Sequence, residues 1–137
     1  MRTTVLLLFA CSLCLGPAVL AADIVRDEGG IAELRLGACV SGLGDQDGDG
    51  ADELLVGAPG YQGGADDGAG RVYLWFGGQA ISLNADRTWQ GSGNEQFGHA
   101  VARIGDVNDD GRDDFAVGAP MSDVGGSESG RVYVFFG

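Results

Sequence analysis

Two short segments of this chain concentrate side chains that could bind a metal ion. Residues 45–53 read DQDGDGADE and residues 106–114 read DVNDDGRDD, so oxygen-bearing side chains recur at positions 1, 3, 5 and 9 of both segments. Position 6 is glycine in both, which allows the backbone to fold back around an ion. Carboxylates this close in sequence repel one another unless a cation lies among them. Calcium accepts about six to eight hard oxygen ligands, backbone carbonyls included, so it is the metal that this pattern favours.

The spacing predicts one calcium site in each segment. Alternate side chains would provide most of the ligands, together with the backbone carbonyl at position 7. Magnesium is less suited, because it demands stricter octahedral geometry and keeps its waters. The first site is expected to use the side chains of Asp45, Asp47, Asp49 and Glu53 with the carbonyl of Ala51, and the second those of Asp106, Asn108, Asp110 and Asp114 with the carbonyl of Arg112.

The segments differ from the helical calcium loop that they most resemble in their first six residues. An EF-hand shares the Asp-x-Asp-x-Asp-Gly opening, but it requires an acidic residue at position 12 and flanking helices. Position 12 is Val56 in one segment and Val117 in the other, which excludes an EF-hand. Ordinary solvated turns are the alternative for either segment alone. Two segments with the same flanks, Gly-Asp at the start and Val-Gly-Ala-Pro after the end, favour calcium.

Both acidic segments belong to a longer internal repeat, which is the main organising feature of the chain. The offset between equivalent residues is 61 in the first part of the repeat and 60 in the last part. One residue is therefore lost in the loop that follows the Gly-Ala-Pro motif. The matched pairs are 36–37 with 97–98, 44–45 with 105–106, 57–59 with 118–120, and 70–73 with 130–133.

Apolar runs separated by clusters of Gly, Asp and Ser predict short strands in each repeat. On the third strand of the first repeat both faces are apolar, so that sheet is expected to be covered on both sides. About four short antiparallel strands per repeat are typical of a β-propeller blade, and the predicted fold is all-β, with about two blades of an incomplete propeller. The expected strands are 38–43, 53–58, 71–76 and 82–90 in the first repeat, and 98–104, 114–119 and 131–136 in the second.

The repeat motifs resemble the FG-GAP repeat of integrin α-subunit β-propellers. Phe97-Gly98 and the motifs that follow it carry the resemblance, whereas Leu36-Gly37 departs from the Phe-Gly start. The resemblance covers nearly all of residues 24–137, with repeat one at about 36–90 and a truncated repeat two at about 97–137. It implies a seven-bladed propeller in the complete family fold, with calcium loops on its lower face. It also implies ligand-binding loops on the opposite face, corresponding to residues 60–69, 84–96 and 121–129.

The first residues predict a secretory signal peptide. Arg2 precedes an apolar run over residues 5–15, which is followed by the helix breakers at 16–17 and then by small residues. The apolar run is short for a bilayer span of about 20 residues, and no later segment could span a membrane. Cleavage after Ala21 would leave residues 22–137 as the repeat domain. The expected location is outside the cell or at the cell surface, or in the periplasm if the source is bacterial.

Composition narrows the functions that this chain can have. The chain has 20 acidic and 8 basic residues, a net charge of −12, which argues against nucleic acid or an anionic membrane as the partner. His99 is the only histidine, no serine lies in a nucleophile elbow, and no catalytic role is expected. Cys39, alone after cleavage, is expected to be a small buried apolar residue, and intermolecular pairing is the less favoured alternative. The favoured function is calcium-rigidified adhesion, or binding of a protein or surface ligand. The alternatives are an accessory fragment of a larger secreted enzyme and a self-associating structural fragment.

Overall fold

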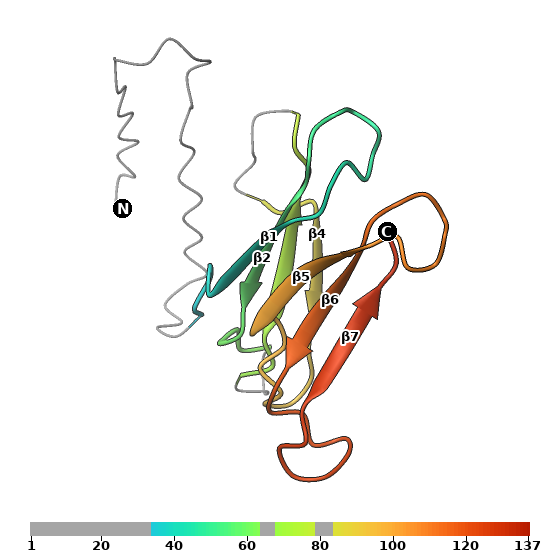
Figure 1. The fold of residues 1–137 in the computed structure, drawn as a ribbon. Helices are drawn as coiled ribbons and strands as arrows, with labels where there is room; N and C mark the ends of the chain where they lie inside the picture. Colours follow the sequence, from blue (N-terminus) through green and yellow to red (C-terminus); the bar gives the residue numbers. More distant parts are fainter. Residues whose placement is uncertain (1–33, 64–67, 79–83) are drawn as a thin grey trace, which may run out of the picture.

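The described part of the chain forms two antiparallel sheets that pack face to face (Figure 1). A computed structural model describes residues 34–63, 68–78 and 84–137, so the predicted signal peptide lies outside the described residues. One sheet has the order β1-β2-β3-β4 and the other the order β5-β6-β7. The expected all-β class is confirmed. The strands are β1 Cys39–Gly42, β2 Leu54–Ala58, β3 Arg71–Trp75, β4 Arg87–Gln90, β5 Ala100–Gly105, β6 Asp114–Ala119 and β7 Arg131–Phe135.

Most of the strand boundaries fall within two residues of the predicted ones, and β4 is the exception. β4 begins at Arg87, well after the predicted start at residue 82, which lies outside the described residues. The backbone N–H of Asp86 still donates to the carbonyl of Leu74 at 2.8 Å, and its carboxylate accepts the N–H of Phe76 at 2.9 Å. Asp86 therefore holds the end of β3 in a turn, and the regular pairing with β3 starts one residue later.

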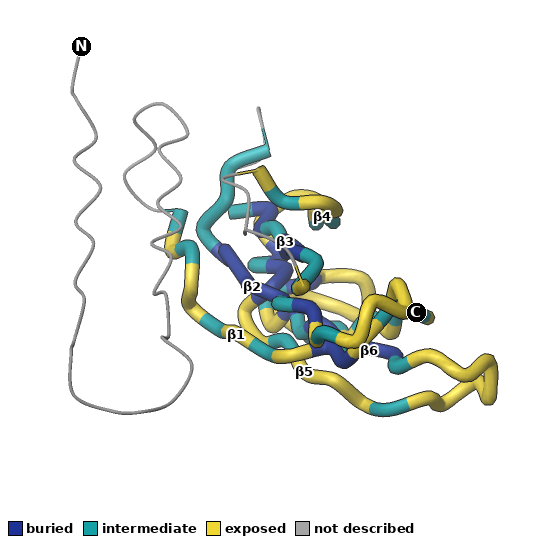
Figure 2. Tube along the Cα trace, turned by 90° about the horizontal axis from the view of Figure 1, so that it is seen from above, coloured by how far each residue is buried: buried dark blue, intermediate teal, exposed yellow. Residues whose placement is uncertain are grey.

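Alternation along β3 places two different apolar surfaces on the first sheet, because successive side chains of a strand point to opposite faces. Val72 and Leu74 are buried against the second sheet. Tyr73 and Trp75 are buried on the other side, where Leu34 and Leu36 pack against them. The prediction that both faces of this sheet are apolar and covered is confirmed. Figure 2 shows the buried backbone running through β2, β3 and β6 in the middle of the described chain.

Aromatic side chains fill the space between the two sheets. The ring of Phe115 on β6 lies 5.0 Å from that of Trp89 and 4.9 Å from that of Phe135, measured between centroids. Phe97 meets Tyr133 edge to face at 5.2 Å. Such aromatic pairs contribute about 0.5–1.5 kcal/mol beyond the burial of their surface. The two sheets are therefore stabilised mainly by one shared core.

Glycine allows the two sheets to approach at the level of the backbone. Gly70 has a φ of +80° and forms an isolated parallel bridge with Phe97, the residue that leads into the second sheet. A Cβ atom at Gly70 would collide with the backbone of Phe97. Only glycine combines this left-handed conformation with so close an approach, because it has no Cβ.

The outer face of the second sheet is apolar and exposed. Val132 is 69% exposed and Val134 is 50% exposed on β7, and they are the repeat equivalents of Val72 and Leu74, which are buried. Phe136 continues the same face and is also exposed. In the described residues, the face of the second sheet that carries Phe115 and Phe135 is thus covered by the first sheet. The opposite face, which carries Val132 and Val134, is exposed.

No helix in the described part of the chain is long and apolar enough to cross a membrane.

Cys39 on β1 lies half-buried beside the start of the second sheet. Its Sγ donates to the carbonyl of Gly98 at 3.1 Å. Burial raises the pKa of this thiol, and the N–H groups of Gly57 and Val101 offset part of that rise. The reactive species is the thiolate, and at a pH below the pKa the fraction of the thiol that is ionised falls roughly tenfold for each unit by which the pKa is raised.

We expect Cys39 to react more slowly with iodoacetamide at pH 8 than cysteine in a short unstructured peptide, because less of it is ionised. Alkylation followed by mass spectrometry of the intact chain measures the rate. The same chain in urea should react at the rate of the peptide. Equal rates for the folded and unfolded chain would contradict the expectation.

Candidate metal centre

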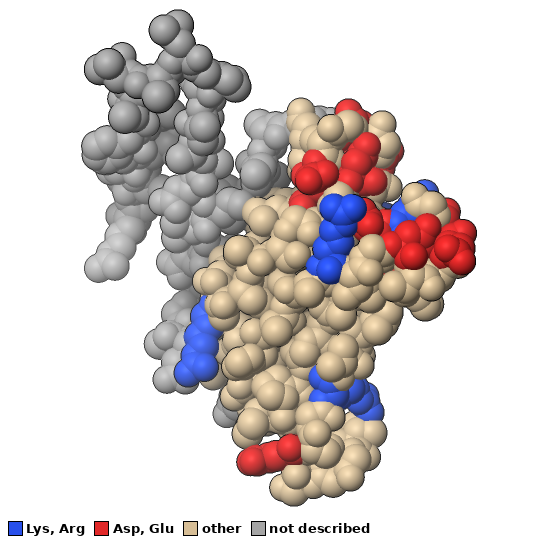
Figure 3. All heavy atoms as spheres, in the orientation of Figure 1, with Lys and Arg blue, Asp and Glu red and all other residues tan. Residues whose placement is uncertain are grey.

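The two acidic loops lie at the same end of the two sheets. One joins β1 to β2 and the other joins β5 to β6, so each is the tip of the first hairpin of its sheet. Figure 3 shows acidic side chains gathered at this end of the molecule. Because the two sheets pack against each other, the repeat places the two equivalent loops side by side.

The first loop brings three predicted ligands together. Asp45, Asp47 and Asp49 each offer a carboxylate oxygen, and these oxygens lie within 4.8 Å of one another on the surface. Backbone donors of the same loop hold them: the N–H of Gly50 donates to Asp45 at 2.9 Å and that of Ala51 to Asp49 at 2.8 Å. The Gly50 N–H is the largest cause that lowers the pKa of Asp45. These backbone bonds hold the three carboxylates of the loop around one point.

The second loop repeats this arrangement with one amide in place of a carboxylate. Asp106 accepts the backbone N–H of Asp110 at 3.0 Å and that of Gly111 at 2.8 Å. The N–H of Arg112 donates to Asp110 at 3.0 Å, as that of Ala51 does to Asp49 in the first loop. Asn108 donates its side-chain amide to Asp110 at 2.7 Å. The two loops therefore share these backbone hydrogen bonds, and their predicted side-chain ligands differ by one charge, at position 3.

The carboxylates at position 9 are buried and each accepts two backbone N–H groups. Glu53 and Asp114 stand at the start of the second strand of their sheets. Each ties position 2 of its own loop to the backbone just after the third strand. Glu53 lies outside the group formed by the first three aspartates of its loop. The bonds to Glu53 come from Gln46 at 2.9 Å and Gly77 at 2.8 Å, and those to Asp114 from Val107 at 2.8 Å and Gly137 at 3.0 Å.

The donor set of the first loop suits a hard divalent cation. It consists of oxygen atoms only, from three converging carboxylates, and calcium prefers such ligands over nitrogen or sulfur. Three exposed carboxylates at this spacing repel one another, and a cation would remove that repulsion. The position-7 residues, Ala51 and Arg112, directly follow glycine in both loops.

Gln46 connects the two loops, a contact that the ligand spacing did not reveal. Its amide nitrogen donates to the carbonyl of Leu43 at 3.2 Å and to the carbonyl of Asp113, in the other loop, at 3.1 Å. The side chain of Asp113 forms an ion pair with Arg103 at 2.6 Å. The equivalent of Gln46 in the second loop is Val107, and this break in the repeat is the signal that could have found it.

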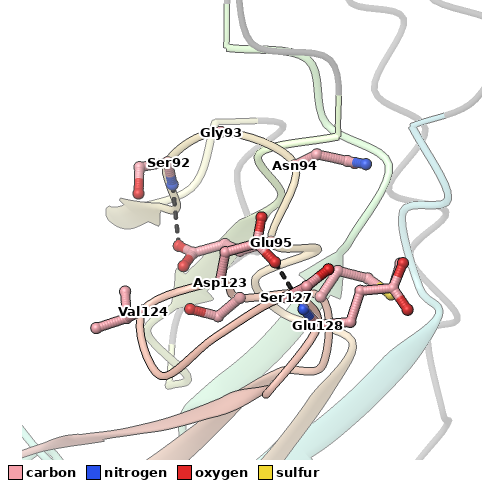
Figure 4. A pocket seen from close by; sticks show the side chains of 10 residues that line it. Ser92, Gly93, Asn94, Glu95, Asp123, Val124, Ser127 and Glu128 are labelled. Carbon is pink, nitrogen blue, oxygen red and sulfur yellow. Dashed lines mark hydrogen bonds between the residues drawn. The ribbon is translucent and has the colours of Figure 1, made fainter.

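A second site candidate lies at the other end of the sheets, among the loops that the resemblance assigns to ligand binding. Residues 92–95 and 121–128 enclose a cavity of about 450 Å³ (Figure 4). Glu95 is buried there and accepts the N–H of Ser92 at 2.9 Å and the hydroxyl of Tyr133 at 2.8 Å. The loop at 60–69 is described only in part, since residues 64–67 lie outside the described residues.

Comparison with known proteins identifies the repeat to which both loops belong. The FG-GAP repeat family matches residues 40–75 and 97–135, which together are more than half of the chain. Integrin alpha-6 of Gallus gallus is 37% identical over 100 residues, covering 68% of this chain and 8% of the relative. Integrin alpha-PS2 of Drosophila melanogaster is 40% identical over 106 residues, covering 68% of this chain and 7% of the relative. Integrin alpha-IIb of Mus musculus is 41% identical over 100 residues, covering 68% of this chain and 10% of the relative.

The chain thus spans a tenth or less of the length of these relatives. The first family match spans β1 to β3 and the second spans β5 to β7, and each match contains one acidic loop between its first two strands. The chain belongs to the FG-GAP repeat family, and its two sheets are β-propeller blades.

Proposed function

We propose that this chain is a calcium-binding FG-GAP module of a secreted or cell-surface protein, with a role in adhesion or in binding a protein ligand and with no catalytic activity. The observation that carries the proposal is the group of three carboxylates at Asp45, Asp47 and Asp49. Its backbone arrangement is duplicated in the second loop, in register with the repeat. If both loops were ordinary solvent-exposed turns, nothing would require the two to have the same acidic positions and the same hydrogen bonds.

Each loop would hold one calcium ion through side chains at positions 1, 3 and 5 and the carbonyl at position 7. Glu53 and Asp114 would complete the two sites from position 9. An ionised carboxylate offers about four lone-pair positions, and two backbone N–H groups use only some of them. The longer side chain of Glu53 would make the first site the larger of the two.

Calcium at these loops would stabilise the two sheets and would take no part in a reaction. It would remove the repulsion among the carboxylates and lock the β1–β2 and β5–β6 hairpins. The loops at the opposite end, around the cavity beside Glu95, would then be presented on rigid sheets. Binding sites are commonly built on loops that a rigid scaffold positions, and the integrin alpha relatives support a protein ligand. The predicted signal peptide at residues 1–21 supports a place outside the cell or at its surface.

We expect calcium to bind this chain at two sites and to raise its melting temperature. Extracellular calcium modules bind at about 10⁻⁴–10⁻³ M, so titration calorimetry should extend to about 10 mM. At a calcium concentration 100 times Kd, each site would add about 2.7 kcal/mol to the free energy of unfolding. Calorimetry gives the number of ions bound, and a thermal melt with and without EDTA gives the stabilisation.

Two variants provide the control. Asp45→Asn should remove the heat of one ion, and Asp106→Asn that of the other, because position 1 is a ligand in both loops. Magnesium at the same concentration should stabilise the chain less, because it keeps its waters. A chain that gives no heat and no change of melting temperature at about 10 mM calcium would sink the proposed function.

A further inference from the structure

One side chain joins the two metal loops across the boundary between the sheets. Gln46 occupies position 2 of the first loop, and its Nε2 donates to the backbone carbonyl of Asp113, position 8 of the second loop, at 3.1 Å. The same nitrogen donates to the carbonyl of Leu43, the last residue before its own loop's Gly-Asp start, at 3.2 Å. The Gln46 amide is therefore fixed by both sheets at once.

The second loop is also held against the first around Asp113. A Cβ atom at Gly44, which directly precedes the first loop, would collide with the Asp113 carboxylate, so the side chain of Asp113 lies against the backbone at the start of the first loop. Asp113 is held in turn by its ion pair with Arg103. Asp47 and Arg112, one from each loop, line the same cavity of about 190 Å³ between the sheets. The contact between the loops thus extends beyond a single hydrogen bond.

Gln46 is also attached to position 9 of its own loop. Its backbone N–H donates to the buried carboxylate of Glu53 at 2.9 Å. Asp113, which accepts the hydrogen bond from the Gln46 side chain, directly precedes Asp114, the buried position-9 residue of the second loop. A change that orders the first loop therefore also orders the residue that contacts the second loop, and the reverse holds as well.

We infer that calcium binding at the two loops is positively coupled, with Gln46 carrying the coupling. The inference rests on the proposed function, since it requires that both loops bind calcium. An ion that orders one loop fixes the Gln46–Asp113 contact, and less ordering then remains for the ion at the other loop. The coupling is reciprocal, because each ion must change the affinity of the other by the same factor. Val107, the equivalent residue of the second loop, has an apolar side chain that is 56% exposed and that cannot donate such a hydrogen bond.

The test is a cycle of four chains, each titrated with calcium chloride in a calorimeter. They are the natural chain, Asp106→Asn, Gln46→Met, and the double variant that combines both changes. Asp106→Asn disables the second loop, so the calcium Kd of the first loop should rise about fivefold, near the lower end of typical allosteric couplings. In the Gln46→Met background the same disabling change should leave that Kd within about twofold.

Matched substitution at the other loop separates coupling from a general effect of position 2. Val107→Met makes the same side chain at the equivalent exposed site, and the fivefold effect of Asp106→Asn should persist in that background. Thermal melts in EDTA establish that every variant is folded before titration. The inference is overturned if disabling the second loop leaves the first loop's Kd unchanged in the natural chain, or if the loss is as large with Gln46→Met. Two independent sites would refute the coupling alone, whereas no calcium uptake by the natural chain would refute the proposed function with it.

Discussion

Asp114→Asn is expected to lower the free energy of unfolding by about 2 to 3 kcal/mol, even with no calcium present. The buried carboxylate accepts the N–H of Val107 with one oxygen and that of Gly137 with the other. Asparagine has one oxygen and one amide nitrogen, so one of the two backbone donors would face another donor with no water to replace it. Urea unfolding in EDTA, followed by tryptophan fluorescence, measures the loss without any contribution from calcium.

Asp109→Asn is the matched control in the same loop. Asp109 is exposed and has a φ of +59°, a conformation that asparagine tolerates well. The same chemical change at this position should alter stability by no more than about 0.5 kcal/mol. If Asp114→Asn were as mild as Asp109→Asn, the buried carboxylate would not be the link between the loop and the end of β7.

Gly70→Ala is expected to lower the free energy of unfolding by about 3 to 4 kcal/mol. The left-handed conformation of residue 70 costs an L-residue about 1–2 kcal/mol. A Cβ atom at this position would also overlap the backbone of Phe97, and forced overpacking costs about 1–3 kcal/mol more. The loss would be a large part of the roughly 5–15 kcal/mol that stabilises a typical domain. Denaturant unfolding of the variant measures it.

Gly93→Ala isolates the conformational part of that loss. Gly93 also has a positive φ, +55°, but a Cβ atom there would meet nothing within 4 Å. Its replacement should therefore cost only about 1–2 kcal/mol. The difference between the two variants measures the close approach of the sheets at Gly70 and Phe97. Equal losses would mean that the backbone of Phe97 can move away at no cost.

Local pattern was sufficient to predict the strands, except for the start of β4, and the grouping of side chains in the first loop. The offset repeat placed Leu55 and Ala116 at equivalent positions, and alternation along β3 separated Val72 and Leu74 from Tyr73 and Trp75, as the structure confirms. The spacing of the acids likewise predicted that Asp45, Asp47 and Asp49 would lie together. These features depend on residues only a few positions apart, where periods of two and backbone turns are decided by near neighbours.

Contacts between distant residues were beyond that pattern. The bond from Gly77 to Glu53 depends on the register that pairs Leu54 with Trp75 across β2 and β3. The contact from Gln46 to Asp113 joins residues 67 positions apart and depends on how one sheet stacks on the next. Neither register nor stacking is encoded in the periodicity of a single strand. The burial of both position-9 carboxylates follows from these long-range contacts and could not be predicted from spacing.

The open valine face of the second sheet gives the stack a direction. The surfaces that meet between the two sheets are unlike. The first sheet contributes aliphatic side chains such as Leu55 and Val72, and the second contributes aromatic ones such as Phe115 and Phe135. Contacts between unlike surfaces do not close on a twofold axis, so they continue in one sense until a ring closes. A stack of this kind is therefore polar, and Val132 and Val134 lie on its exposed aliphatic surface in the described residues. Substitutions of Val132 and Val134 should therefore leave the core between the two described sheets unchanged, because neither side chain belongs to it.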